Sequence, residues 1–262
     1  MNSKELRKKY LREEKTKFCP GCGYEIFINC FLKAVEELGI DFYKTIFVSG
    51  IGCAAWIPSP HFKAETLHTT HGRALTFTTG IRLVRPKERI VIISGDGDLA
   101  TIGGNHLIHS ARRNLPMSVF CMNNSIYGMT GGQPSATTPK GTFTSIDPEG
   151  SNDCPFDLMN LVLSSGAKFA SRYPIAFKEE MTEGIKHNLL AGENQFSFTE
   201  IVSVCPTQFG ERNNFKSSGE MINKQKEIFV TQEKLWKLVQ GKKVFGQFPS
   251  LDKYIELERL TR

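Results

Sequence analysis

Apolar and polar positions alternate in a way that predicts helices and strands in turn along most of the chain. Residues 24–38 carry apolar side chains at helical spacing, and the pattern ends at Gly39, a residue type common just beyond a helix. A β-branched run follows at 45–48, and a continuous apolar run at 89–93 leads directly into Ser94-Gly95-Asp96-Gly97. Such a run followed by a loop predicts a buried strand of a parallel sheet.

The same alternation continues to about residue 204. We expect helices at 101–114, 155–165 and 176–190, and strands at 117–122, 166–171 and 197–204. The segment from about 211 to 262 is a more polar tail, with one amphipathic helix expected near 231–240. Alternating strands and helices predict a single α/β domain over 1–262, with a parallel sheet and helices on both faces. In such sheets ligands bind beyond the carboxyl ends of the strands.

The composition is that of an ordinary globular protein, since 40% of the 262 residues are hydrophobic and 23% are charged. No apolar run approaches the ~18 residues of a membrane span, and the charged start lacks a secretory signal, so we expect a cytoplasmic protein without a membrane span. The net charge of +6 is spread along the chain. Its densest part, 4–17, is interpreted as a solvated arm, with docking of an acidic protein as the alternative. The chain has no basic face interleaved with aromatic residues, so we do not expect nucleic-acid binding.

Two strand-end loops carry the strongest chemical signal. Gly95-Asp96-Gly97 follows one predicted strand, and Asn123-Asn124 follows the next. The glycines allow close approach of the backbone to a phosphate group, while Asp96 and Asn124 offer the hard oxygens that Mg²⁺ prefers. The carbonyl of Ile126 is a candidate third ligand. The pattern therefore predicts a site for a magnesium-bound diphosphate.

Two other interpretations of the glycine-rich loop are weaker. The run Gly95-Asp96-Gly97-Asp98-Leu99-Ala100 fits the dinucleotide-binding pattern, but Asp96 would repel a pyrophosphate that has no metal. The acidic ribose-binding residue expected about 20 positions later is also absent from 115–120. The remaining alternative is structural, with the glycines in turns and Asp96 as a helix cap.

Seven cysteines are unevenly spaced, and in a cytoplasmic chain this favours metal or cluster binding over disulfides. Cys19 and Cys22 form a C-x-x-C knuckle at about 18–23, just before the first predicted helix. The pair is compatible with half a zinc site, a redox dithiol or part of an iron–sulfur cluster. Three others are interpreted as small buried hydrophobic residues: Cys30, Cys121 and Cys154.

Five ordered motifs over about 18–210 resemble one family. The fingerprint of thiamine-diphosphate enzymes is a Gly-Asp-Gly segment followed, about two dozen residues later, by Asn-Asn, and this chain resembles it. CPGCG at 19–23, GIGCAAWIP at 50–58, HTTHGR at 68–73, GDGDLATIGGN at 95–105 and NNSIYGMTGGQ at 123–133 resemble the β subunits of 2-oxoacid:ferredoxin oxidoreductases. Relatives of that family include pyruvate and 2-oxoglutarate synthases.

The resemblance implies the thiamine-diphosphate-binding fold and a set of site residues. It implies a 4Fe–4S cluster held by Cys19, Cys22, Cys53 and Cys205, and Mg²⁺ held by Asp96, Asn124 and Ile126. It places His68, His71 and Arg73 at the cofactor or the substrate carboxylate as candidate catalytic residues. The implied cofactor-binding residues are Gly52, Cys53, His71, Gly72, Gly95, Asp96, Gly97, Asp98, Asn124, Ile126, Gly128, Met129 and Thr130.

The resemblance also implies a reaction and partners. The reaction is oxidative decarboxylation of a 2-oxoacid with coenzyme A, giving an acyl-CoA, CO₂ and reduced ferredoxin. A chain of this size holds only the diphosphate half of the cofactor site, so an α subunit is expected to supply the pyrimidine half and the catalytic glutamate. Three glutamates are therefore expected not to take that role: Glu25, Glu65 and Glu200. The expected assembly is a dimer of αβ units.

Substrate choice is left open by the sequence. The resemblance favours 2-oxoglutarate, with pyruvate and branched-chain 2-oxoacids as alternatives. Trp56 stands where several relatives carry a basic residue thought to meet the substrate, so specificity does not carry over at this position. A non-redox thiamine decarboxylase or synthase, which the cysteines disfavour, and a zinc-binding scaffold are the competing functions.

Overall fold

The fold is built on an eight-stranded, mostly parallel sheet. The computed structural model describes residues 1–13, 15–231 and 243–248. The strand order is β2-β1-β3-β4-β8-β7-β10-β9, and a separate two-stranded ribbon pairs β5 with β6. The strands are β1 Thr45–Ser49, β2 Thr66–His68, β3 Arg89–Gly95, β4 Met117–Asn123, β5 Ile126–Tyr127, β6 Gln133–Pro134, β7 Phe169–Pro174, β8 Phe196–Val202, β9 Phe229–Thr231 and β10 Lys243–Phe248.

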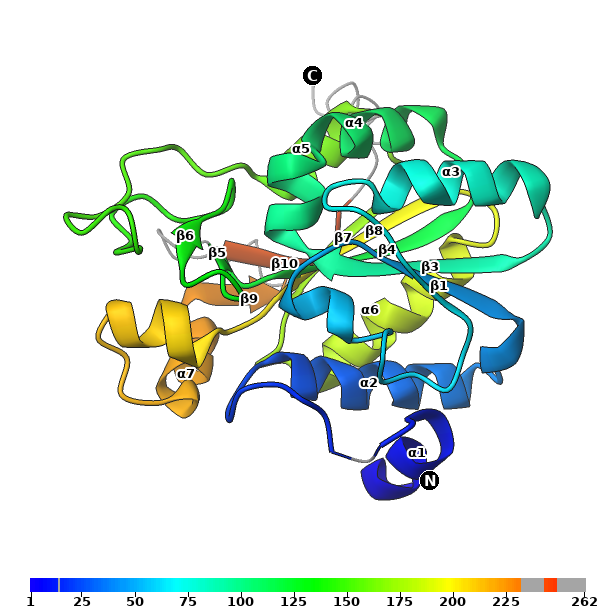
Figure 1. Cartoon of the computed structure of the whole chain (residues 1–262), viewed down its shortest axis with the longest axis horizontal. Helices are drawn as coiled ribbons and strands as arrows, with labels where there is room; N and C mark the ends of the chain where they lie inside the picture. Colours follow the sequence, from blue (N-terminus) through cyan, green and yellow to red (C-terminus); the bar gives the residue numbers. More distant parts are fainter. Residues whose placement is uncertain (14, 232–242, 249–262) are drawn as a thin grey trace, which may run out of the picture.

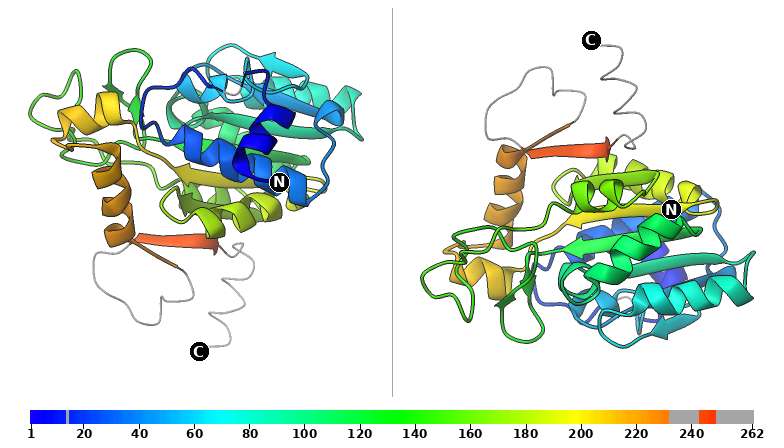
Figure 2. Two further views of the ribbon diagram at one scale, coloured as in Figure 1. Left: turned by 90° about the horizontal axis from the view of Figure 1, so that it is seen from below. Right: turned by 90° about the horizontal axis from the view of Figure 1, so that it is seen from above.

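Helices cover both faces of the sheet, as the alternation predicts (Figures 1 and 2). One face is covered by α2 and α6, with α1 packed against α2, and the other by α3, α4 and α5. The last helix among the described residues, α7, lies beside the segment that follows β8. The helices are α1 Ser3–Tyr10, α2 Tyr24–Glu37, α3 Ala74–Val84, α4 Gly104–Arg113, α5 Leu158–Ser164, α6 Lys178–Ala191 and α7 Ser218–Ile228.

Each face has its own apolar core. Under α2 the core is largely aromatic, and Phe31 stacks on Phe62 with ring centroids 5.7 Å apart. The same ring meets Phe47 and Phe120 nearly edge-on, a geometry that aromatic pairs prefer. Under α3, α4 and α5 the core is mainly aliphatic. The buried runs of β3 and β4 divide their side chains between the two cores, which explains why these strands read as continuously apolar.

The predicted elements between 24 and 204 are all present, and most differ from their predicted bounds by one to three residues at an end. The helix expected at 101–114 begins only at Gly104, because 97–102 form a wide π-type turn. The strand expected at 166–171 runs from 169 to 174. Gly166, with a φ of +102°, lies in the turn between the end of α5 and this strand, so the strand begins later. The helix expected near 231–240 falls, apart from its first residue at the end of β9, outside the described residues.

The polar tail adds structure that the sequence pattern did not predict. β10 pairs antiparallel with β7, and β9 pairs parallel with β10, so the tail extends the sheet. One cysteine prediction was wrong. Cys30 and Cys121 are buried as expected, but Cys154 is exposed, because the segment before α5 runs over the surface.

Candidate cofactor site

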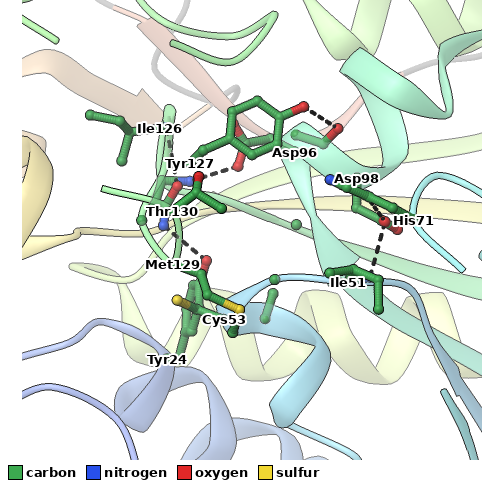
Figure 3. Close-up of a pocket in the computed structure, with 16 residues that line it drawn as sticks. Tyr24, Ile51, Cys53, His71, Asp96, Asp98, Ile126, Tyr127, Met129 and Thr130 are labelled. Atoms are coloured by element: carbon green, nitrogen blue, oxygen red, sulfur yellow. Dashed lines mark hydrogen bonds and ion pairs between the residues drawn. The ribbon is translucent and has the colours of Figure 1, made fainter. Parts of the chain in front are cut away.

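A pocket opens at the edge of the sheet where the parallel strands end (Figure 3). Loops that follow β1, β2, β3 and β4 line it, together with the first residue of α2. All predicted cofactor-binding residues except Gly72 lie in its wall. Because parallel strands end at one edge, segments far apart in sequence meet there, as expected for an α/β sheet.

Asp96 and Asn124 lie next to each other in this wall, at the ends of β3 and β4. The backbone N–H of Asn124 donates to Asp96 Oδ1 at 3.4 Å, and Asn124 Oδ1 accepts from the N–H of Ile126 at 3.1 Å. Asp96 is only 2% exposed, and its Oδ2 accepts from the hydroxyls of Ser135 and Thr137. Burial raises the pKa of the Asp96 carboxyl, and these hydrogen bonds oppose the rise. The three predicted magnesium ligands therefore share one pocket.

Both carboxylate oxygens of Asp98 accept hydrogen bonds from neighbouring parts of the protein. Its Oδ1 accepts from the N–H of Ile51 at 3.1 Å, from the N–H of Gly72 at 2.7 Å and from His71 Nδ1 at 2.5 Å. Its Oδ2 accepts from Ser94 Oγ at 2.8 Å. Figure 3 shows Asp98 between His71 and Ile51. Asp98 thus joins the loops that follow β1, β2 and β3, and its role as a direct cofactor contact stays a prediction.

Of the three predicted catalytic residues, only His71 lines the pocket. Because a carboxylate can only accept, Asp98 requires the proton of His71 to sit on Nδ1, which leaves Nε2 available to a bound molecule. His68 ends β2 with its ring exposed and Nδ1 3.4 Å from Ser49 Oγ. Arg73 is exposed at the start of α3. Neither His68 nor Arg73 lines the pocket, and their catalytic roles stay predictions.

Two glycines are required by close packing. A Cβ on Gly97 would stand 2.4 Å from the ring of Tyr127, whose hydroxyl donates to the Gly97 carbonyl at 2.9 Å. A Cβ on Gly50 would stand 1.9 Å from the carboxylate of Asp98. Real Cβ atoms do not come this close to other atoms, so neither position accepts alanine without moving the loops.

Four cysteines gather in a second pocket of about 210 Å³, which shares a wall with the first. Residues common to both walls include Tyr24, Cys53, Gly128 and Met129. A Cβ on Gly128 would be 3.4 Å from one cysteine Sγ and 3.8 Å from another. The four cysteines are those that the resemblance implies, Cys19, Cys22, Cys53 and Cys205.

The thiols are held close enough to influence one another. Burial, with a smaller contribution from neighbouring cysteines, raises the pKa of Cys22 to about 12 and that of Cys53 to about 11. As the side chains stand, no group of three or more His, Cys, Asp or Glu in the described part of the chain is arranged to hold a metal ion. The donor set nevertheless suits an iron–sulfur group, because bound iron stabilises the thiolate form that burial and the neighbouring cysteines disfavour.

Several residues of the site gave no signal in the sequence. Tyr24 is fully buried between the two pockets, and its hydroxyl accepts from Asn124 Nδ2 at 3.0 Å. Ser135 and Thr137 come from a loop with no periodic pattern, yet both bind Asp96. For Tyr24, the only indication in the sequence of a place at the site was its position directly after the C-x-x-C-G segment.

A family model covers most of this edge of the sheet. The model described as the C-terminal TPP-binding domain of thiamine pyrophosphate enzymes matches residues 50–201. The 2-oxoglutarate synthase subunit KorB of Methanothermobacter marburgensis is 46% identical over 92% of this chain and 85% of its own length. The chain belongs to the 2-oxoacid:ferredoxin oxidoreductase β-subunit family.

Other similar proteins belong to the same family. The KorB subunit of Methanocaldococcus jannaschii is 42% identical over 97% of this chain and 95% of its own length. The β subunit of a 2-oxoacid:ferredoxin oxidoreductase from Saccharolobus solfataricus is 38% identical over 75% of this chain and 64% of its own length. A solved structure of 2-oxoglutarate:ferredoxin oxidoreductase from Magnetococcus marinus, described with 2-oxoglutarate, coenzyme A and succinyl-CoA bound, matches with a TM-score of 0.81 at 30% identity. That match covers 100% of this chain and 91% of the other.

Membership of the oxidoreductase family confirms the predicted fold, the thiamine-dependent class and the nature of the chain as one subunit of an enzyme. The matched range contains the whole predicted diphosphate site, from Gly52 to Thr130, whereas Cys19, Cys22 and Cys205 lie outside it. No helix in the described part of the chain combines the length and apolar character needed to cross a bilayer.

Proposed function

We propose that this chain is the β subunit of an enzyme that converts 2-oxoglutarate and coenzyme A into succinyl-CoA, CO₂, a proton and two electrons, which pass to ferredoxin. The choice of 2-oxoglutarate is supported by the names of the relatives that match nearly the whole chain and by the molecules described in the matching solved structure. When bound, thiamine diphosphate would supply the carbanion chemistry of decarboxylation.

The observation that carries the proposal is the pair of adjacent pockets. In the first, Asp96, Asn124 and the carbonyl of Ile126 would hold Mg²⁺ against the diphosphate, since they are hard oxygen donors in one wall. Tyr24 supports this, because accepting from the Asn124 amide nitrogen orients the amide so that its oxygen remains on the opposite side. His71 would contact the cofactor or the substrate through Nε2.

In the second pocket the four cysteines would hold a 4Fe–4S cluster, which requires four thiolates. Cys53 lies in both walls, so the thiols and the diphosphate site would be neighbours without an intervening layer of protein. This placement suits a group that takes up electrons at the reacting centre.

An α partner would complete the site. The walls of the first pocket, in the part of the chain that the structure describes, contain no glutamate. Glu25 pairs with Arg7, Glu65 is exposed, and Glu200 is buried behind the loop in an ion pair with Arg172. None of the three is placed to meet a pyrimidine ring in this pocket, which supports a catalytic glutamate from the partner and an assembly of αβ units.

Anaerobic co-purification with the α subunit tests the proposal. The complex should contain iron and acid-labile sulfide, bind thiamine diphosphate only with Mg²⁺, and reduce a viologen dye when given 2-oxoglutarate and coenzyme A. Pyruvate and branched-chain 2-oxoacids serve as comparison substrates in the same assay. A complex that lacks iron, or that decarboxylates 2-oxoacids without reducing the dye, would refute the proposed redox function.

A further inference from the structure

A buried ion pair connects β7 and β8 behind the loop that carries Asp96. Arg172 and Glu200 are directly paired in the register of the two strands. Arg172 Nε donates to Glu200 Oε2 at 2.6 Å, and Arg172 Nη2 donates to Asp157 Oδ1 at 2.8 Å. The side chains of Arg172 and Glu200 are only 14% and 4% exposed. A buried pair of charges adds little stability by itself. The groups to which the pair is hydrogen-bonded are therefore the better guide to its role.

The second oxygen of Glu200 determines how Asn123 is oriented. Asn123 Nδ2 donates to Glu200 Oε1 at 2.6 Å. Because a carboxylate can only accept, the amide nitrogen must face Glu200, and Oδ1 must turn toward the strand-end loops. Arg172 in turn holds Glu200 in place, so the orientation of the Asn123 amide is set from the interior of the sheet.

From Asn123 the network reaches Asp96 through the Thr137 hydroxyl, which lies within hydrogen-bond distance of an acceptor on each residue. Thr137 Oγ1 lies 2.9 Å from Asn123 Oδ1 and 2.7 Å from Asp96 Oδ2. The backbone N–H of Ser125 also donates to Asn123 Oδ1, at 2.9 Å. The hydroxyl of Thr137 has a single proton for the two acceptors, so the acceptor that receives it depends on the orientation of the Asn123 amide. Ser135 Oγ lies 3.0 Å from Thr137 Oγ1 and also donates to Asp96 Oδ2, so Thr137 and Ser135 together hold this carboxylate.

We propose that Glu200, held by Arg172, is a positioning residue for the metal site, acting on Asp96 through Asn123 and Thr137. This inference rests on the proposed function, in which Asp96 binds the cation of Mg²⁺–thiamine diphosphate. Glu200 itself lies in no position to touch the cofactor, because Asn123 and Thr137 stand between them. Outer groups that orient metal ligands typically change metal affinity by about 10- to 100-fold when they are removed.

The alternative is that the ion pair only stabilises the fold. The two ideas differ in what a perturbation changes. If the pair is purely structural, its removal lowers the thermal midpoint of the complex without changing the affinity of the complex for Mg²⁺. A positioning pair changes Mg²⁺ affinity, and the effect disappears when the connection through Thr137 is already broken.

The test uses the complex with its α subunit, freed of cofactor by dialysis against EDTA. Isothermal titration calorimetry with Mg²⁺ in the presence of saturating thiamine diphosphate gives the metal affinity, and calorimetric scanning gives the thermal midpoint. The variants are Glu200→Gln, Thr137→Val, their combination, and Thr137→Ser, which keeps the hydroxyl. The matched control is Ser171→Ala, because Ser171 is equally buried on β7 beside Arg172 but bonds to Thr199 instead of the Asp96 loop.

Glu200→Gln and Thr137→Val should each weaken Mg²⁺ binding by about tenfold or more. Thr137→Ser and Ser171→Ala should stay within about twofold of the wild type, and the double variant should be no weaker than the worse single variant. If Glu200→Gln gives no folded complex, Glu200→Asp replaces it, since aspartate keeps a charge beside Arg172 but draws its carboxylate back from Asn123 and should also weaken binding.

Two results overturn the inference. The first is Mg²⁺ affinity within about twofold of the wild type in either the Glu200 or the Thr137→Val variant, and the second is a double variant whose loss equals the product of the single losses. A wild-type complex that binds no thiamine diphosphate with Mg²⁺ would instead refute the proposed function, and the inference would fall with it. The two failures are therefore distinguished by the wild-type titration alone.

Discussion

Replacing Asp98 by alanine should loosen three loops at once. Four groups donate to this carboxylate: the backbone N–H groups of Ile51 and Gly72, the ring of His71 and the hydroxyl of Ser94. Water can reach Ile51 and His71, which are partly exposed, after the change. Gly72 and Ser94 are buried and would be left without this acceptor.

The magnitude follows from the two buried donors. Each buried donor that loses its acceptor costs about 1–3 kcal/mol, so Asp98→Ala should lower the free energy of unfolding by about 2–6 kcal/mol. Asp98→Asn keeps the shape and one acceptor oxygen toward Ile51 and Gly72, so its loss should be near 1 kcal/mol. Thiamine diphosphate binding should weaken much more in Asp98→Ala than in Asp98→Asn, since only alanine releases the loops.

Urea unfolding of the purified complex, followed by circular dichroism, measures these differences. Asp153→Ala serves as the control, because Asp153 is an exposed aspartate away from the pocket and its removal should leave stability unchanged. The reasoning would be refuted if Asp98→Ala unfolded within about 0.5 kcal/mol of the wild type, or if Asp98→Asn were as unstable as the alanine variant.

Three further predictions concern the core, the thiols and pH. Phe31→Ala should lower the free energy of unfolding by about 3–5 kcal/mol in urea titrations, because this fully buried ring contacts four others; a loss below about 1 kcal/mol would contradict the packing. Cys205→Ser should lower iron and sulfide per subunit in metal analysis, whereas Cys154→Ser, at an exposed thiol, should leave both unchanged; equal values in the two variants would argue against the cluster ligands. Burial lowers the pKa of His61 below 6.5, so the unfolded chain binds this proton first, and stability should fall as pH decreases through about 6.5. His61→Gln should show a smaller fall between pH 7 and 5 in thermal scans, and an unchanged slope would exclude His61 as the cause.

The sequence predicted the place of the site better than its internal contacts. Strand ends in a parallel sheet converge by topology, so Asp96 and Asn124 could be brought together from the strand pattern alone. The role of Asp98 could not be predicted, because its partners Ile51 and Gly72 use backbone N–H groups, which carry no signature in the sequence. The exposed ring of His68 could not be predicted for a different reason. A residue's place in a motif indicates that it lies near the site, but not the direction in which its side chain points.

The same distinction applies to the fold. The helices and strands that were predicted between 24 and 204 follow from periodicity, because each buries one face or both in a core. The helix α3 and the short strands β2, β5 and β6 in this range were not predicted. The strands of the tail were not predicted, since β10 pairs antiparallel with β7 and its short apolar pattern is interrupted by Gly246 in a positive-φ conformation. Exposure of Cys154 was missed because a cysteine in a loop has no periodic neighbours to indicate burial.

The thiol pocket also determines at which point of synthesis all four proposed cluster ligands are present in the chain. Its walls combine Cys19, from the segment before α2, with Cys205, from the segment just after β8. A ribosome releases the chain from its amino end, so the last thiol emerges only after nearly all of the sheet has been made. In the proposed function, delivery of iron and sulfide to the complete set would therefore follow the synthesis of Cys205, and chains truncated before β8 would carry only the first three of the four thiols.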